Sequence, residues 1–368
     1  MRRVLVAWGS AALFTTASAA QVPARLSDSA FGALSAALSE PSGYFDTDNL
    51  VSNEDSYLHP IPTLARLGLA GGAYLGVGPD QNFSYIAAIK PSVAFIVDIR
   101  RDNLLELLLF KAIFALSRNR LEYLCLLFGK TGPADTAGWS ARGPDALLSF
   151  IGSARGDSTG AVTRVKTRIQ RLGMALSATD LETLDRFHRA FIQAGPGLKL
   201  TSFGRGERVD YPDFRKLMLE KDRGGRQSSY LASEPAFRAV KALQDRNLVV
   251  PVVGNFAGDK ALAAVGKYLR DHGETVTMFY TSNVEQYLVQ DGILDRFARN
   301  VNGLPRRLDA VIVRSYFPYG RPHPQLVAGY LSVQLVQRIE KFLVQRFLVN
   351  RPTRETYFDL VTTDLVEP

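Results

Sequence analysis

A βαβ pattern between residues 72 and 98 is the feature that most constrains the fold of this chain. Residues 72–78 form a short apolar run that ends in a Gly-Val-Gly turn, and residues 92–98 form a second apolar run that ends in an aspartate. The residues between them, 80–89, have the composition of a helix. Two buried strands joined by a helix predict a parallel pair, because parallel strands require a crossover connection.

The glycine turn and the acid that follows it predict a ligand site. Gly76 and Gly78 allow backbone N–H groups and the N-terminus of the next helix to approach a ligand. Asp98 lies 20 residues after Gly78, a spacing at which an acid binds ribose hydroxyls in dinucleotide-binding folds. We therefore expect a small, nucleoside-containing ligand. The pattern also occurs in NAD-binding and other nucleotide-binding folds, so it names no reaction.

The alternation of strands and helices resumes after a long helical stretch. We expect strands at residues 248–253, 275–280 and 308–314, a helix at residues 260–271, and a last strand or helix near residues 326–336. This order predicts an α/β fold with a mostly parallel, doubly wound sheet that is covered on both faces. In such sheets ligands bind outside the carboxyl ends of the strands. Four polar loops are expected to converge there: residues 76–82, 98–103, 254–259 and 281–287.

The first 20 residues have the pattern of a secretory signal peptide. Two arginines precede an apolar segment at residues 4–14, and small residues follow at 17–20. The segment is too short for a permanent membrane span. We therefore expect a periplasmic or secreted protein with no stable membrane span after cleavage. The alternative is a cytoplasmic protein with an apolar N-terminus.

Charge and composition exclude several classes of protein. The formal net charge is +8, which weakly favours anionic ligands, but the basic residues are dispersed and do not indicate nucleic-acid binding. Cys125 is the only cysteine, so no intrachain disulfide forms, and its apolar surroundings predict a buried, inert thiol. The four histidines are scattered and do not indicate a metal site.

A polar loop at residues 43–57 lies directly before the βαβ unit, where it is placed to fold over the glycine turn. Its acids raise the alternative of a calcium site. Asp46 and Asp48, however, lack the later glycine and bidentate glutamate of an EF-hand loop. A solvated or helix-capping loop is therefore favoured.

The glycine turn, Asp98 and the later strand–loop–helix units together resemble class I S-adenosylmethionine-dependent methyltransferases. Residues 254–258 and 280–288 resemble more closely a family of uncharacterised bacterial proteins described as methyltransferase-like. The closer resemblance extends from about residue 43 to residue 317. The wider resemblance, to the methyltransferases, implies a Rossmann-like fold, S-adenosylmethionine as cofactor and methyl transfer as the activity.

The resemblance also implies roles for individual residues. Gly76 and Gly78 would face the methionine part of the cofactor, and Asp98 would accept hydrogen bonds from its ribose. The chain departs from the methyltransferase pattern at Tyr74, where an acid is usual, and at Asp80, where a third glycine is usual. No Asp/Asn-Pro-Pro-aromatic motif follows the fourth strand.

The expected organisation has five parts. These are a signal peptide at 1–20, an N-terminal helix and polar lid loop at 21–70, a Rossmann-like α/β domain at 71–340 with a helical insertion at 104–246, and a C-terminal tail at 341–368.

The predicted cofactor-binding residues are those of the converging loops: Gly76, Gly78, Asp80, Gln81, Asn82, Asp98, Asn255 and Asn283. Glu285 and Asp259 are the predicted catalytic bases, because a carboxylate at a strand end is partly desolvated.

Structural roles are the alternative for several of these residues. Asp80, Gln81 and Asn82 would then cap the helix. Asp98 would pair with Arg100 or Arg101, and the side chains at 283 and 285 would satisfy loop backbone groups.

Two functions follow. The first is a methyltransferase-like enzyme that acts on a small or surface-bound acceptor. The second is an exported, non-catalytic metabolite-binding or interaction protein that uses the same cleft. The oligomeric state stays open.

Overall fold

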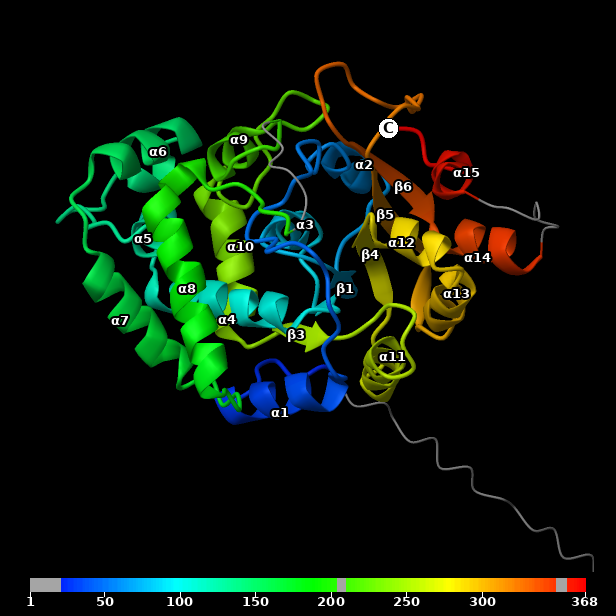
Figure 1. The fold of residues 1–368 in the computed structure, drawn as a ribbon, viewed down its shortest axis with the longest axis horizontal. Helices are drawn as coiled ribbons and strands as arrows, with labels where there is room; N and C mark the ends of the chain where they lie inside the picture. Colours follow the sequence, from blue (N-terminus) through cyan, green and yellow to red (C-terminus); the bar gives the residue numbers. More distant parts are fainter. Residues whose placement is uncertain (1–20, 204–209, 349–355) are drawn as a thin grey trace, which may run out of the picture.

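A six-stranded sheet forms the centre of the computed structural model, which describes residues 21–203, 210–348 and 356–368 (Figure 1). The predicted signal peptide, residues 1–20, lies outside these ranges. The strands are β1 (Ala73–Gly76), β2 (Val93–Asp98), β3 (Val249–Val253), β4 (Val276–Ser282), β5 (Arg306–Tyr316) and β6 (Val333–Arg338). Their order across the sheet is β3-β2-β1-β4-β5-β6, and all neighbours are parallel except β5 and β6. The predicted α/β class with a mostly parallel sheet is confirmed.

The predicted βαβ unit is present as β1, α3 (Gln81–Ile89) and β2. Every residue of both strands is buried, as expected for a parallel sheet that is covered on both faces. Lys90 ends α3 in the left-handed conformation. The strands pair in parallel from Ala73 opposite Val93 to Gly76 opposite Ile96, which brings the glycine turn and Asp98 to the same edge of the sheet.

The later strands lie where the sequence placed them, with shifted ends. The segment at 326–336, which the sequence left open, contributes β6, and this strand begins only at Val333. Pro251 lies inside β3, where its missing N–H is tolerated because β3 is an edge strand. Its carbonyl accepts a hydrogen bond from Ser35 of α1 (Asp28–Leu38), which covers that edge.

Helices occupy the long connection between β2 and β3 and form the left half of the molecule in Figure 1. They are α4 (Arg101–Leu116), α5 (Arg120–Leu127), α6 (Pro144–Ser153), α7 (Ser158–Ile169), α8 (Ala178–Ala194), α9 (Phe214–Leu219) and α10 (Glu234–Asp245), with two 3₁₀ turns at Trp139–Ala141 and Gly195–Gly197. Of these, α4 contacts β3 and also packs against α7, α8 and α10. This buried helix therefore joins the sheet to the helical layer.

The remaining helices complete the cover of the sheet. They are α2 (Ile61–Arg66), α11 (Ala261–Asp271), α12 (Val284–Gln290), α13 (Leu294–Asn302), α14 (Ile339–Phe347) and α15 (Tyr357–Thr362). No helix in the described ranges has the length and apolar character needed to cross a membrane.

Candidate functional site

A cavity of about 480 Å³ opens at the carboxyl ends of the parallel strands. All four polar loops that were expected to converge contribute to its wall, through Gly78, Asp98, Asn255 and Asn283 among others. Its volume lies within the range of about 300–1,000 Å³ that is typical of small-molecule sites. Strand order reverses between β1 and β4, and ligands of doubly wound sheets bind at such a switch point.

The glycine turn is shaped by packing beneath it. Gly78 lines the cavity and has a φ of +82°, a conformation that favours glycine. Gly76 does not line the cavity; a Cβ there would lie 2.0 Å from Oδ1 of Asn82. Asn82 donates from Nδ2 to the carbonyls of residues 77–79, and its Oδ1 accepts a hydrogen bond of 2.7 Å from Tyr74. Tyr74, Gly76 and Asn82 therefore hold the turn and do not face the ligand space.

Asp80 and Gln81, which were predicted to bind a cofactor, do not line the cavity either. The carboxylate of Asp80 accepts a hydrogen bond of 3.0 Å from the hydroxyl of Tyr230, and burial raises the pKa of Asp80 to about 6. The amide of Gln81 lies 3.3 Å from the hydroxyl of Tyr280. Both residues line a separate space of about 20 Å³ beside α9, which is large enough for only about one water molecule.

Asp98 lines the cavity, but its carboxylate is already paired. Arg100 donates to it from Nε at 3.1 Å, from a terminal nitrogen at 2.9 Å and from its backbone N–H at 2.9 Å. The other terminal nitrogen of Arg100 donates to the carbonyls of Thr47 and Asp48. The alternative role, ion pairing with Arg100, is the one that the structure shows. A ribose would have to compete with this bidentate pair.

Asn255 and Asn283 line the cavity as predicted. The backbone N–H of Asn255 donates to Glu40 over 2.6 Å, and its Oδ1 accepts from Ala257. Asn283 precedes α12, and its Oδ1 lies 3.4 Å from the hydroxyl of Ser282. Both side chains therefore lie at the ends of strands and within reach of a ligand.

Neither predicted base lies in the cavity. Glu285 is fully buried on the inner side of α12, where its carboxylate pairs with Arg314 at 2.5 Å and accepts from Thr281. Asp259 is 93% exposed and pairs with Arg296 on the surface. One carboxylate is committed to an internal ion pair, and the other is solvated. The structure therefore supports neither residue as the base.

Glu54 is the acid that the sequence prediction missed. It lines the cavity, yet only 1% of its surface is exposed. Its carboxylate accepts hydrogen bonds from Tyr280 at 2.5 Å, from Gln334 at 2.9 Å and from Ser282. All three donors are neutral, and burial raises the pKa of Glu54.

No local signal separates Glu54 from the other acids of its loop. The partners of its carboxylate come from β4 and β6, more than 220 residues later in the chain. Only the folded sheet brings them together.

Ser282, which lies beside Glu54, has a strained backbone conformation. Its φ is +53°, which is uncommon for a residue other than glycine. Such strain persists where the surrounding structure holds it, and it is frequent at functional sites. The conformation ends β4 and directs the hydroxyl of Ser282 onto Glu54.

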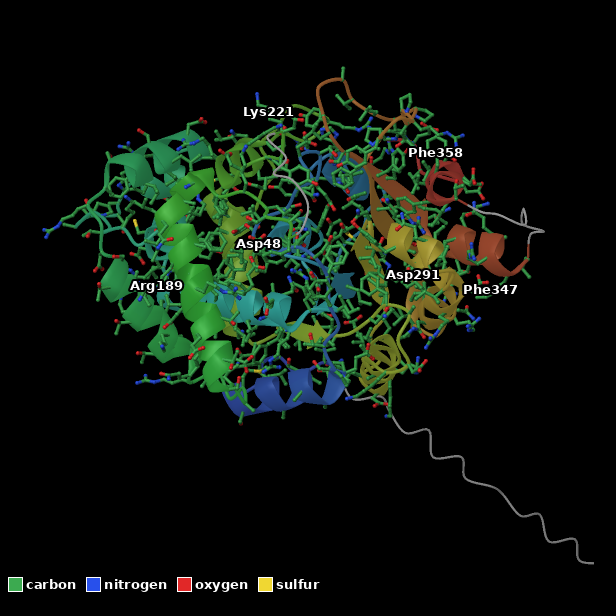
Figure 2. All side chains as sticks on the ribbon, viewed as in Figure 1. Asp48, Arg189, Lys221, Asp291, Phe347 and Phe358 are labelled. Atoms are coloured by element: carbon green, nitrogen blue, oxygen red, sulfur yellow. The ribbon has the colours of Figure 1, made fainter. Side chains whose placement is uncertain are left out.

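The loop at residues 43–57, called the lid loop below, forms one wall of the cavity. It pairs with the helical region through an isolated β-bridge between Thr47 and Ser202. Arg100 donates hydrogen bonds to two of its backbone carbonyls. Asn49 lies near the glycine turn, 3.5 Å from the position of a Cβ on Gly78. Figure 2 shows the side chains around this edge, with Asp48 of the lid loop and Asp291 after α12 labelled.

Aromatic rings line much of the cavity. Phe45 meets Tyr287 edge to face with 5.0 Å between ring centroids, and Phe317 stacks on Tyr319 at 5.9 Å. Tyr44 is largely exposed at the wall. The site therefore combines aromatic faces with many polar side chains.

Comparison with known proteins identifies a family without an assigned activity. A family model described as a domain of unknown function, DUF7790, matches residues 49–137 and 200–362. The two segments contain all six strands and most of the cavity wall, and the unmatched residues between them contain α6, α7 and α8. None of the curated proteins matches the chain. Because the matched segments cover well over half of its length, the chain belongs to the DUF7790 family.

Proposed function

We propose that the cavity binds a small nucleoside-containing metabolite, with S-adenosylmethionine as the leading candidate, and that the protein is a methyltransferase-like enzyme with a Rossmann-like sheet. The position of the cavity carries this proposal. The cavity lies where the strand order reverses, between β1 and β4. Gly78 lies beside it with a left-handed φ, and it has no side chain of its own to cover its backbone there. The strand order is that of a doubly wound nucleotide-binding sheet with an antiparallel edge strand.

The residues of the cavity suit methyl transfer to an acceptor that loses a proton. S-Adenosylmethionine, when bound, supplies a methyl group on a positively charged sulfur. An acceptor oxygen or nitrogen would form the new bond to that carbon, and the electron pair of the broken carbon–sulfur bond would stay on sulfur. Glu54 is placed to take the acceptor's proton, directly or through Ser282. The protein's main contribution would be to hold the two reactants in line.

A non-catalytic binding protein is the second candidate, and the pairing of Asp98 favours it. The acid expected on a ribose is held by Arg100, so the cavity need not take a ribose. Export, if residues 1–20 direct it, points the same way, because S-adenosylmethionine is made in the cytoplasm. A reporter fused after the N-terminal segment tests the location, and activity of the fusion outside the cytoplasm would favour this second candidate.

Calorimetry with two glycine variants tests the binding proposal. Gly78→Ala and Gly138→Ala place the same residue at nearly the same φ, +82° and +79°. Only Gly78 lines the cavity, and a Cβ on Gly138 meets nothing within 4 Å. We expect S-adenosylmethionine to bind the wild type and Gly138→Ala alike, and to bind Gly78→Ala at least about ten-fold more weakly, which is about 1.4 kcal/mol.

Absence of S-adenosylmethionine binding to the wild type at millimolar concentration would sink the proposal. Binding without release of S-adenosylhomocysteine in the presence of candidate acceptors would leave the second candidate standing.

A further inference from the structure

The charge of the described residues that line the cavity is opposite in sign to the charge of the whole chain. The chain carries a formal net charge of +8, which by itself favours anionic ligands. Among the described residues that line the cavity, however, the acids are Glu54, Asp98 and Asp291, and the only cationic side chain is Arg100. The local balance is therefore negative.

Arg100 is not available to an anionic ligand. Every nitrogen of its guanidinium donates to protein oxygens, either to Asp98 or to the lid loop. The pair with Asp98 is buried, and an anion that recruited Arg100 would leave Asp98 uncompensated. The described wall thus offers no free cation to a phosphate or a carboxylate.

Glu54 has the opposite property, because no cationic side chain within the described residues pairs with its buried carboxylate. Its neighbours Tyr280, Ser282 and Gln334 donate hydrogen bonds but carry no positive charge. A buried charge is costly unless it is paired. A ligand that brings a positive charge to this position would supply the missing partner.

The aromatic wall suits the same kind of ligand. Phe45, Tyr287, Phe317 and Tyr319 form two ring pairs that line the cavity, and Tyr44 stands exposed beside them. Aromatic faces attract ammonium and sulfonium groups through their quadrupole, and they do so most strongly when the site is desolvated. The acid and the rings line the same cavity.

We propose that the cavity selects organic cations, namely amines, ammonium compounds or sulfonium compounds with an apolar or planar body. Glu54 is the residue that recognises their positive charge. This inference rests on the proposed binding role of the cavity and narrows its ligand class. With this selectivity the cavity would bind cationic nucleoside compounds in preference to anionic ones such as NAD and nucleoside phosphates.

Binding to pairs of probes that differ in positive charge tests the inference. The probes are S-adenosylmethionine with S-adenosylhomocysteine, and phenethylamine with 2-phenylethanol; adenosine monophosphate serves as the anionic probe. In calorimetry with the wild type, we expect the cationic member of at least one pair to bind about ten-fold or more tightly than its partner. Glu54→Gln should reduce that preference to about two-fold or less. Glu182→Gln, an exposed acid on α8, is the control and should keep the preference.

The outcomes separate this inference from the proposed function. If adenosine compounds bind with no preference for positive charge, the nucleoside proposal survives and the cation inference is overturned. If phenethylamine binds through Glu54 and no adenosine compound binds, the reverse holds. Failure of every probe to bind overturns both. The wild-type comparison decides the matter even if Glu54→Gln does not fold.

Discussion

At the scale of single residues, the identity of the partner decides what a buried acid does. Glu285 and Glu54 are both buried near the end of β4. The carboxylate of Glu285 meets the guanidinium of Arg314, so its charge is compensated inside the protein. Among the described residues, Glu54 meets only neutral donors, and it lines the cavity. The first therefore contributes to the fold, and the second is free to meet a ligand.

This difference predicts that Glu285→Gln lowers stability. The substitution keeps the volume but leaves Arg314 buried without a compensating charge, a loss of about 3–5 kcal/mol for internal pairs. Glu340→Gln is the matched control, because Glu340 pairs with Arg306 while 43% of its side chain is exposed, and surface pairs contribute about 1 kcal/mol or less. Urea unfolding of the two variants measures the difference. Equal unfolding free energies would show that the pair of Glu285 and Arg314 is not structural.

At the scale of elements, Arg100 connects the lid loop to the end of β2. Its guanidinium forks between Asp98 and the carbonyls of Thr47 and Asp48. The lid loop also bonds to the helical region, where the N–H of Asp48 donates to the carbonyl of Thr201. One side chain thus links the strand end, the loop and the cavity wall.

We expect Arg100→Lys to loosen the lid loop without unfolding the sheet. Lysine keeps a positive charge for Asp98 but lacks the planar fork that reaches both partners. Hydrogen exchange should become faster at Asp48 and its neighbours, and it should stay unchanged in β1 and β2. Arg101→Lys serves as the control, because Arg101 pairs with Asp180 of α8 and its side chain makes no hydrogen bond to the lid loop within the described residues. Equal hydrogen exchange in the lid loops of both variants would show that the Arg100 side chain does not hold the loop to the end of β2.

The elements themselves were largely predictable, and their partnerships were not. Apolar runs and turn residues placed β1, α3 and β2 within a few positions, because these signals are local. The end of the sheet was harder, since β6 is defined by antiparallel pairing with β5 and not by its own pattern. The position of the cavity, at the carboxyl ends of the parallel strands, followed from the strand directions. The side chains that face it did not, because contacts such as that of Glu54 with Tyr280 join residues far apart in the sequence.

At the scale of the whole molecule, Lys111 connects three helices, α4, α10 and α1. It lies buried in α4, donates to the carbonyl of Gln244 in α10 over 2.8 Å, and lies 4.5 Å from the ring centroid of Phe31 in α1. No carboxylate pairs with it within the described residues. Burial consequently lowers the pKa of Lys111 from 10.5 to about 7.

This shift predicts a stability that rises above neutral pH. Between pH 7 and pH 9 the unfolded chain holds a proton on Lys111 that the folded protein has largely lost, so the free energy of unfolding increases with pH. The contribution over this interval is about 2 kcal/mol for one proton. In Lys111→Met this contribution disappears. The free energy of unfolding of the variant, relative to that of the wild type, should therefore be higher at pH 7 than at pH 9.

Urea unfolding of both proteins at the two pH values measures the change. Lys267→Met is the control, since Lys267 is exposed and pairs with Asp271 on the surface of α11. Its difference from the wild type should be the same at both pH values. If Lys111→Met also showed a constant difference, Lys111 would hold its proton in the folded state. Its ammonium would then be one more buried charge that this fold accommodates through backbone carbonyls and an aromatic face.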